Sequence, residues 1–427
     1  MQYEDNAMTQ AGNLARTAFI PLVLIISLFF FWGVAASLND ILIKQFKKAF
    51  ELSDLQAGLV QSAFYLGYFL FALPAAIFMR RYSYKAAIVM GLLLFAAGAL
   101  LFYPAAEVHT YGLFLLALFV IASGLAFLET SANSLVIMLG PADGAARRLN
   151  LAQAFNPLGS ITGVLIGSHF IFSGIEHGAQ DLATMAPAAR SAYLATESAA
   201  VQTPYLVIAF VVIMWAVLVA MVKFPTAHDH SGKEASTGSQ LKELLRNRNF
   251  VFAVVAQLVY VGAQVGVWSY LIRYVQDMVP GTPEKTAASF LTLSLMLFMF
   301  GRFLGTALLR KVSAANLLAG CAVADIVLCL VAIAMPGMVG LYALVGVSLF
   351  MSVMFPTIFV LGLTGLDDDH RKLGSSMLVM AIIGGALLPP IMGGVSDLVG
   401  IHWSIAVPAV SFLLILVFAL RAPRAIR

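Results

Sequence analysis

Four ionisable residues stand inside long apolar runs of the sequence, and they are the places where proton chemistry could occur. They are Asp40, Glu129, Arg302 and Asp325. An ionisable side chain in the hydrocarbon of a bilayer costs about 2.5 to 3.5 kcal/mol, so such residues indicate function. Glu129 lies deepest, and its side chain is too short to reach the membrane surface. A buried carboxyl that gains and loses a proton as its surroundings change can couple proton movement to a change of conformation; the alternative is a permanently neutral acid bonded to a neighbouring Thr or Asn.

The other charged residues each allow a functional and a structural interpretation. Asp40 shares a helix face with Trp32, because a spacing of eight residues returns to the same side of a helix. It could carry protons, or it could form an i,i+4 pair with Lys44. Arg302 and Asp325 lie on successive apolar runs, at depths that differ by roughly 6 Å. They could simply pair, or Arg302 could act as a gate.

A stripe of polar residues runs along the apolar segment 148–174. Its members recur every three or four residues and therefore share a helix face: Asn150, Gln153, Asn156 and Ser160. Amide groups both donate and accept hydrogen bonds, which suits the hydroxyl groups of a sugar. Pro157 and Gly159 weaken the helix, and such breaks are tolerated where the backbone lines a cavity. The stripe predicts a sugar-binding surface; the alternative is hydrogen bonding between helices.

A second stripe combines aromatic and amide side chains on the segment 249–274. Its members are separated by three, four and four residues: Gln257, Tyr260, Gln264 and Trp268. An aromatic and amide face suits a pyranose, which has apolar C–H faces and a rim of hydroxyl groups. Trp268 lies nearer the end of the segment, so a place in the aromatic belt at the membrane surface is the alternative for it.

The composition identifies the solvent in which these residues act. Of 427 residues, 61% are hydrophobic and only 11% are charged, against about 25% charged in soluble domains. Soluble enzymes, disordered chains and nucleic-acid binders are therefore excluded, and the lipid bilayer is the expected environment. Cys321 and Cys329 lie eight residues apart, about 12 Å along one helix, which is too far for a disulfide. The sequence has neither a metal-binding His or Cys cluster nor a phosphate-binding GxxxxGK[ST] loop, so no metal, no cofactor and no enzymatic or ATP-driven activity are expected.

The apolar runs predict an all-α membrane protein with twelve transmembrane helices. The expected spans are 19–43, 55–79, 84–106, 110–138, 148–174, 202–223, 249–274, 286–309, 314–335, 338–362, 371–395 and 402–421. The gap between the fifth and sixth runs, about 175–201, is expected to carry a short helix. The first run is longer than the apolar core of a signal peptide, so it is expected to be retained.

Lysine and arginine counts predict the orientation of these spans. The loops on the side of the N-terminus carry 18 Lys and Arg, and the opposite loops carry six. Because cytoplasmic loops are enriched in positive residues, both termini are expected in the cytoplasm. The resulting division is a cytoplasmic N-terminus at 1–18, a six-helix bundle at 19–223, a cytoplasmic linker at 224–248, a second six-helix bundle at 249–421 and a cytoplasmic tail at 422–427.

The two bundles repeat one another. Arg80-Arg81-Tyr82-Ser83 follows the second span, and Arg310-Lys311-Val312-Ser313 follows the eighth. A basic pair likewise precedes the fifth span, at Arg147-Arg148, and the eleventh, at Arg371-Lys372. Two halves in the same orientation are typical of transporters that bind their substrate between the halves near the membrane midplane.

Several stretches from both halves resemble one family when they are taken together. They are FFWG through ND at 30–40, LETSAN at 128–133, RLNLAQAFNPLG at 148–159, GRFLGT at 301–306, MFPTIF at 354–359 and GSSM through LPP at 374–390. These stretches are similar to the fucose:proton symporter branch of the major facilitator superfamily. Within that branch, QVGVWSYLIRY at 264–274 looks more like the L-fucose permeases than the glucose/galactose members.

The resemblance implies roles for individual residues. Asp40 and Glu129 match the two membrane carboxylates of the family, which implies that they carry the coupled proton. The residues implied or expected to bind sugar are Trp32, Glu129, Asn133, Gln153, Asn156, Tyr260, Gln264 and Trp268. The resemblance also implies import of L-fucose or a close relative with protons by alternating access. The turn at 79–84 departs from the wider superfamily, because it lacks the usual Asp-Arg-x-Gly pattern.

Other activities stay open at this stage. One alternative is a glucose/galactose transporter coupled to protons or sodium, and another is a sugar sensor derived from a transporter. The expected partners are a small sugar and the lipid bilayer, without nucleic acid, and the expected state is a monomer. The expected location is a bacterial inner membrane, crossed many times.

Overall fold

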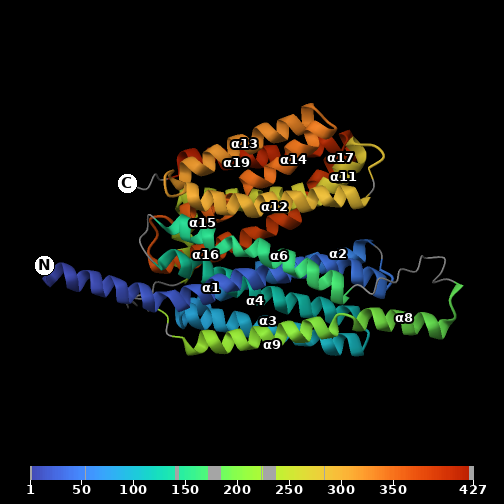
Figure 1. Cartoon of the computed structure of the whole chain (residues 1–427), viewed down its shortest axis with the longest axis horizontal. Helices are drawn as coiled ribbons and strands as arrows, with labels where there is room; N and C mark the ends of the chain where they lie inside the picture. The colour runs from blue at the N-terminus through green and yellow to red at the C-terminus, as the bar shows by residue number, and fades with distance from the viewer. Residues whose placement is uncertain are drawn as a thin grey trace. The chain divides into compact units, whose positions relative to one another are not determined.

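The computed structural model describes residues 2–52, 54–139, 144–171, 184–222, 224, 237–282 and 284–422. Within these ranges every regular element is helical (Figure 1). The helices form two compact units. Unit 1 comprises Met1–Ala132 and Leu158–Phe224, and unit 2 comprises Asn133–Pro157 and Pro225–Arg427. The bundle boundaries expected from the sequence stay predictions.

Unit 1 is built around the long first helix. Its elements are α1 (Gln2–Ala49), α2 (Asp54–Arg81), α3 (Tyr84–Glu107), α4 (Tyr111–Met138, up to Ala132), α6 (Phe155–Ile166, from Leu158), the π-helix η2 (Gly167–Ile171), α8 (Pro187–Ala199) and α9 (Gln202–Met221). α3 packs along α9, and α1 packs against α2 and α8.

Unit 2 contains the remaining helices. They are α5 (Ala145–Gln153), α10 (Thr237–Arg246), α11 (Arg248–Met278), α12 (Glu284–Leu308), α13 (Ala314–Ala334), α14 (Met338–Met351), α15 (Met354–Leu363), α16 (Asp368–Met380), the 3-10 helix η3 (Ala381–Ile383), α17 (Gly384–Val399), α18 (Ile401–Ser404) and α19 (Ala406–Arg421). α11 packs against α17, α19 and α12, and α5 packs against α12 and α15.

The described residues include eleven helical stretches that are long and apolar enough to cross a membrane. The other expected span, 148–174, is divided into α5, α6 and η2, and its last residues lie outside the described ranges. Its first break falls at Ala154, three residues before Pro157. A proline cannot donate the i→i−4 hydrogen bond that would continue the helix. The all-helical membrane fold is confirmed, with this span interrupted rather than continuous.

The polar gap at 175–201 contains the short helix that the sequence predicts, α8. Its Glu197 is only 1% exposed and forms an ion pair with Lys48 of α1 at 2.9 Å. The Gln45 side chain, also on α1, donates to the same carboxylate at 2.9 Å and to the Glu197 carbonyl at 2.8 Å. Because the buried charge is paired and hydrogen-bonded, α8 is fixed to the end of α1.

Glycine lets α6 approach α1 closely in unit 1. A Cβ on Gly159 would overlap the carbonyl oxygen of Phe30, and a Cβ on Gly163 would lie 2.7 Å from the carbonyl oxygen of Val34. The same device recurs in unit 2, where a Cβ on Gly384 would overlap the carbonyl oxygen of Leu258 on α11. In each unit the fifth apolar segment therefore packs through glycine on the first, which supports the internal repeat.

Replacing Gly159 is expected to destabilise unit 1. The Cβ of Gly159→Ala must displace the α1 backbone, and overpacking of this kind costs typically about 1 to 3 kcal/mol. Gly112→Ala on α4 is the matched control, because nothing lies within 4 Å of a Cβ there and alanine favours a helix. Thermal unfolding of the purified proteins should show a lower midpoint for Gly159→Ala than for the wild-type chain, and no such decrease for Gly112→Ala. Equal midpoints for the two variants would contradict this packing.

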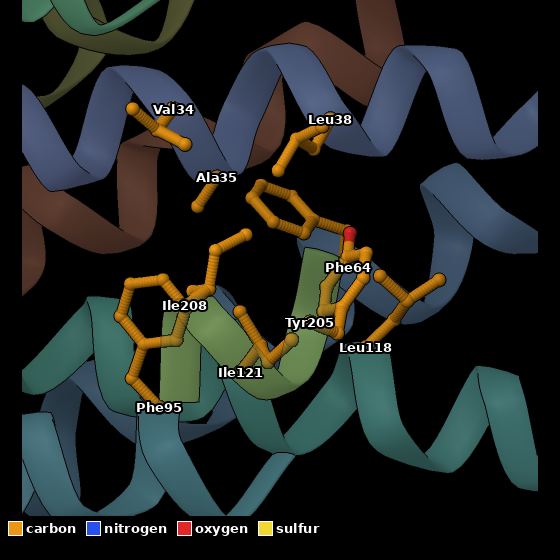
Figure 2. A pocket seen from close by; sticks show the side chains of 9 residues that line it. All are labelled: Val34, Ala35, Leu38, Phe64, Phe95, Leu118, Ile121, Tyr205 and Ile208. Carbon is orange, nitrogen blue, oxygen red and sulfur yellow. The ribbon is translucent and has the colours of Figure 1, made fainter. Parts of the chain in front are cut away.

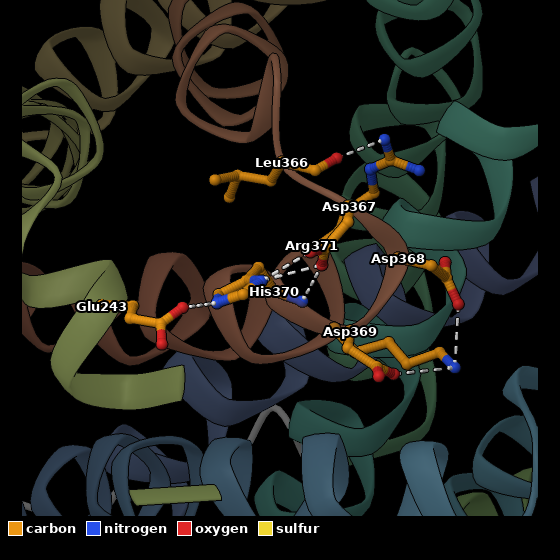
Figure 3. Close-up of polar contacts among 8 residues, drawn as sticks. Glu243, Leu366, Asp367, Asp368, Asp369, His370 and Arg371 are labelled. Carbon is orange, nitrogen blue, oxygen red and sulfur yellow. Dashed lines mark hydrogen bonds and ion pairs between the residues drawn. The ribbon is translucent and has the colours of Figure 1, made fainter. Parts of the chain in front are cut away.

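The linker between the predicted bundles contains α10, which contacts α16 through a chain of polar groups (Figure 3). The imidazole of His370 lies 3.0 Å from a Glu243 oxygen through Nε2. Its Nδ1 lies 2.8 Å and 2.9 Å from the two Asp367 oxygens. Asp367 also accepts the backbone N–H of His370 at 2.8 Å, so it caps the first turn of α16. A protonated His370 donates to both carboxylates, which joins α10 to α16.

The Asp367 cap predicts a pH-dependent contribution to stability. Burial opposes the charged form, but the His370 N–H and imidazole and the nearby Arg371 together hold the pKa of Asp367 below its usual value. A depressed pKa gives stability that is present above the unfolded pKa of about 3.9 and is lost as the pH falls through the lower folded value. Asp367→Ala should therefore cost about 1 kcal/mol at pH 7 and progressively less below about pH 4.

Thermal unfolding of the wild-type chain and Asp367→Ala between neutral and acidic pH measures this difference. The control is Asp397→Ala, which removes an exposed carboxylate near the end of α17 and should stay within about 0.5 kcal/mol. A constant difference between wild type and Asp367→Ala at every pH would mean that the charge of Asp367 makes no contribution.

Candidate functional site

Unit 1 brings an indole, a phenol and a carboxyl group together from α1, α2 and α4. Trp32 Nε1 donates to the Tyr68 hydroxyl at 2.5 Å, and the Trp32 ring stacks on Phe29 with centroids 5.2 Å apart. Glu129 is 5% exposed and interacts electrostatically with Tyr68. All residues from 121 to 136 of α4 are buried, so water reaches this carboxyl poorly. A proton on Glu129 therefore changes the charge of a secluded cluster.

A second polar contact lies beside Asp40. Asn39 is buried and donates through Nδ2 to the Gln61 side-chain oxygen at 3.1 Å. The Asp40 side chain itself lies outside the part of the chain that the structure describes, so its proposed proton role stays a prediction. Gln61 and Tyr68 were not expected from the sequence. The sequence feature that could have identified them is their spacing of seven residues within an apolar run, which places both on one face of α2.

In unit 2, Arg302 of α12 binds the end of α5. Its NH1 donates to Gln153 Oε1 at 2.8 Å and to the Gln153 carbonyl oxygen at 3.0 Å. In a continuous helix the carbonyl of residue 153 would accept the N–H of residue 157. Residue 157 is proline and has no N–H, so the carbonyl is open to the guanidinium. The broken helix thus creates the acceptor that Arg302 uses.

The amide of Gln153 continues this chain to α4. Its Nε2 donates to Asn133 Oδ1 at 3.2 Å. One turn earlier on α5, Asn150 Nδ2 donates to the Ala146 carbonyl at 2.9 Å and lies 3.4 Å from the Thr357 hydroxyl. Asn133 Nδ2 and Asn150 Oδ1 are buried and have no hydrogen-bond partner among the described residues. Unsatisfied amide atoms of this kind are suited to a polar ligand or ordered water.

An aromatic path leads from Arg302 to the predicted residues of α11. The guanidinium lies over the Phe298 ring, 4.8 Å from its centroid, and Phe298 meets Trp268 edge-on at 5.0 Å. Trp268 Nε1 donates to the Ser348 hydroxyl at 3.1 Å. Trp268 is therefore hydrogen-bonded within unit 2 and is not only an aromatic-belt residue.

The other predicted sugar-binding residues differ in burial and in hydrogen bonding. Tyr260 is fully buried and donates to the Met351 carbonyl at 3.0 Å, so its hydroxyl is engaged within unit 2. Gln264 lies one turn further along α11 and is half-buried, as is Asn156 on α6. Gln257 is fully buried, and neither atom of its amide has a hydrogen-bond partner among the described residues. The sugar-binding roles of these residues stay predictions.

The structure does not form the pair between Arg302 and Asp325 that the sequence allowed. Asp325 on α13 is fully buried, and neither carboxyl oxygen has a hydrogen-bond partner in the described part of the chain. α13 packs on α14 and α19, whereas α12 turns Arg302 toward α5. Similar depth was therefore insufficient for pairing, because the guanidinium of Arg302 is held by Gln153 instead. Sequence reasoning also missed Phe298, Ser348 and Thr357, whose partners are remote in the chain.

A cavity inside unit 1 does not provide a sugar site. Figure 2 shows its apolar lining, in which Val34 and Leu38 of α1 face Phe64 and Ile121. Its volume is about 10 Å³, whereas small-molecule sites enclose roughly 300 to 1,000 Å³. The cavity is a packing space within the helices, and the functional candidates remain the polar clusters around Glu129 and Arg302.

Comparisons with known proteins identify the family of the chain. The family model described as the Major Facilitator Superfamily matches residues 22–382. The chain is 46% identical over 418 residues to the L-fucose-proton symporter of Escherichia coli (strain K12), covering 97% of this chain and 95% of that protein. It is 37% identical over 394 residues to a glucose/galactose transporter of Brucella abortus, covering 92% of each. The crystal structure of the transporter FucP in its outward conformation matches with a TM-score of 0.89 and 46% identity, covering 96% of this chain and all of that one.

Proposed function

The chain belongs to the major facilitator superfamily, and from this premise we propose that it is a secondary active transporter that imports L-fucose, or a close stereochemical relative, together with protons by alternating access. The relatives named above are transporters, which supports transport and not an enzymatic reaction. The proton is the coupling ion, and no metal or organic cofactor takes part.

The observation that carries the proposal is the buried carboxyl of Glu129 beside Tyr68 and Trp32. When Glu129 is protonated, the cluster holds no net charge, so the protein can close over it at little cost. When Glu129 is ionised and no sugar is bound, closure would bury a charged carboxylate, which is unfavourable. The protonated, sugar-bound form therefore closes more readily than the ionised, sugar-free form.

The similarity to the Escherichia coli protein favours the fucose branch over the hexose branch. The chain shares 46% of its residues with that L-fucose-proton symporter and 37% with the glucose/galactose transporter of Brucella abortus. The amides of Asn133 and Gln153 and the indoles of Trp32 and Trp268 are the proposed sugar contacts. Amide groups match the hydroxyl rim of a pyranose, and indole rings match its C–H faces.

Sugar uptake into proteoliposomes tests the substrate and the coupling ion together. Labelled L-fucose should accumulate under an inward proton gradient, and the accumulation should collapse with a protonophore. Excess D-glucose or D-galactose should not compete, and replacement of sodium should have no effect. Competition by either hexose would assign the chain to the hexose branch. Dependence of uptake on sodium would identify sodium, instead of the proton, as the coupling ion. Binding of L-fucose without any uptake would indicate a sensor.

We place Asp40 on the proton route, which makes a specific prediction. Asp40→Asn should reduce net accumulation of L-fucose at least about tenfold, while exchange of labelled for unlabelled sugar continues. Exchange requires no proton release, because the loaded carrier returns loaded. Measurement of both rates on the same proteoliposomes checks this. An equal loss of accumulation and exchange would mean that Asp40 is a structural residue instead.

The cellular setting follows from the same proposal. The excess of 18 over six basic residues places both termini in the cytoplasm. The chain is a multi-pass integral membrane protein, and we place it in a bacterial inner membrane. It acts as a monomer in the lipid bilayer, with a small sugar as its partner.

A further inference from the structure

A groove opens on unit 1 where the start of α3 lies against the end of α9. Its volume is about 300 Å³, which is far larger than the cavity beside α1. Ser83 and Lys85 form its polar end, and Val89, Met90, Leu93 and Ala220 form its apolar length. The sugar and proton residues proposed above do not line it. The groove therefore needs an occupant of its own.

The polar end of the groove is cationic and ordered. Lys85 Nζ donates to the Ala220 carbonyl at 2.6 Å and to the Val222 carbonyl at 2.9 Å. An ammonium group has three N–H donors, so one donor remains for a ligand. Ser83 accepts the Ala86 N–H at 3.0 Å, which leaves its own hydroxyl proton available to donate. The exposed Arg81 lies four residues before Lys85 in the chain.

The apolar length of the groove follows from helix periodicity. Lys85, Val89 and Leu93 are spaced by four residues and therefore form one stripe along α3. Met90 widens the stripe, and the small Ala220 of α9 leaves room beside it. Leu93 is 48% exposed. Both helices belong to membrane-spanning segments, so this stripe faces hydrocarbon rather than water.

We infer that this groove binds one anionic phospholipid of the surrounding membrane, with its phosphate at Lys85 and Ser83 and one acyl chain along Val89, Met90 and Leu93. A sugar or a nucleotide would leave the apolar stripe unfilled. A zwitterionic lipid brings a positive charge of its own toward Lys85, whereas the headgroup of an anionic lipid is attracted to the lysine. The lipid would hold the start of α3 against the end of α9 at the basic side of unit 1.

Native mass spectrometry of the delipidated protein tests this site. The protein is mixed with equal amounts of dioleoylphosphatidylglycerol and dioleoylphosphatidylcholine, and we expect preferential retention of the phosphatidylglycerol. Lys85→Met should weaken its binding about fivefold, whereas Lys85→Arg should retain it. Leu93→Trp fills the apolar length and should reduce binding of both lipids. The matched control is Lys311→Met, because Lys311 is exposed in the equivalent basic turn of unit 2 and lies outside the groove.

Every outcome of this experiment decides the proposal. Equal retention of the two lipids, or equal losses in Lys85→Met and Lys311→Met, would show non-specific lipid around the protein and overturn the site. Displacement of phosphatidylglycerol by glycerol phosphate or inorganic phosphate would assign the polar end to a free phosphate and also overturn it. If Lys85→Met fails to fold, Lys85→Arg and Leu93→Trp still separate the outcomes. Sugar uptake does not enter the measurement, so the proposed function stands or falls separately.

Discussion

Glu129→Gln is expected to abolish proton-driven accumulation of L-fucose while leaving sugar exchange largely intact. The glutamine side chain resembles the protonated acid, so the variant should bind sugar and change conformation without releasing a proton. For a symporter that carries one proton, each pH unit across the membrane supports about tenfold accumulation. The wild-type protein should therefore concentrate the sugar, and the variant should only equilibrate it.

The matched control for this carboxylate is Glu107→Gln. Glu107 is exposed on α3 and accepts a hydrogen bond from Gln202 at 3.1 Å, away from the cluster around Tyr68. Accumulation and exchange are both measured in proteoliposomes with an imposed proton gradient. Accumulation by Glu129→Gln at the wild-type level would remove Glu129 from the coupling mechanism. Loss of exchange along with accumulation would point to a role in sugar binding alone.

Arg302→Met is expected to have the second large effect, on sugar affinity and on stability. The guanidinium is 5% exposed and is the donor to both oxygens of Gln153. Its removal leaves two buried acceptors without that donor, at roughly 1 to 3 kcal/mol for each. The Gln153 amide then loses its fixed orientation toward Asn133, so the KM for L-fucose should rise at least about tenfold.

Arg302→Lys separates a positioning role from a purely structural one. A lysine keeps the charge but not the planar donor fork, so it should restore part of the stability and less of the sugar affinity. Arg310→Met removes an exposed arginine just after the end of α12 and serves as the control. Initial uptake rates over a range of sugar concentrations and thermal unfolding of each variant are the measurements. An unchanged KM in Arg302→Met would contradict the role given to the contact with Gln153.

The sequence predicted the elements of this structure more successfully than the contacts between them. Apolar runs and basic loops are local features, so they located the spans, the short helix α8 and the internal repeat. Pro157 also predicted a weak point in the fifth span, although the break lies at Ala154 and its consequence is an open carbonyl at Gln153. That consequence requires Arg302, which lies 149 residues away in the chain.

Contacts of this kind depend on the direction in which each side chain leaves its helix. Arg302 and Asp325 have similar expected depths, yet Arg302 donates to Gln153 and the Asp325 oxygens have no hydrogen-bond partner among the described residues. Tyr68 gave a weak signal because one tyrosine in an apolar run fits packing as well as function. Its position beside Trp32 and Glu129 follows from the packing of α1, α2 and α4, which residue spacing alone does not determine.

The most direct test of proton-coupled sugar transport is whether sugar alone moves protons. Proteoliposomes with a pH-sensitive dye in the lumen and no imposed gradient receive L-fucose from outside. We predict that the lumen of wild-type vesicles acidifies as the sugar enters, and that vesicles with Glu129→Gln take up sugar without acidifying. Entry of L-fucose into wild-type vesicles with no change in luminal pH would contradict symport with protons.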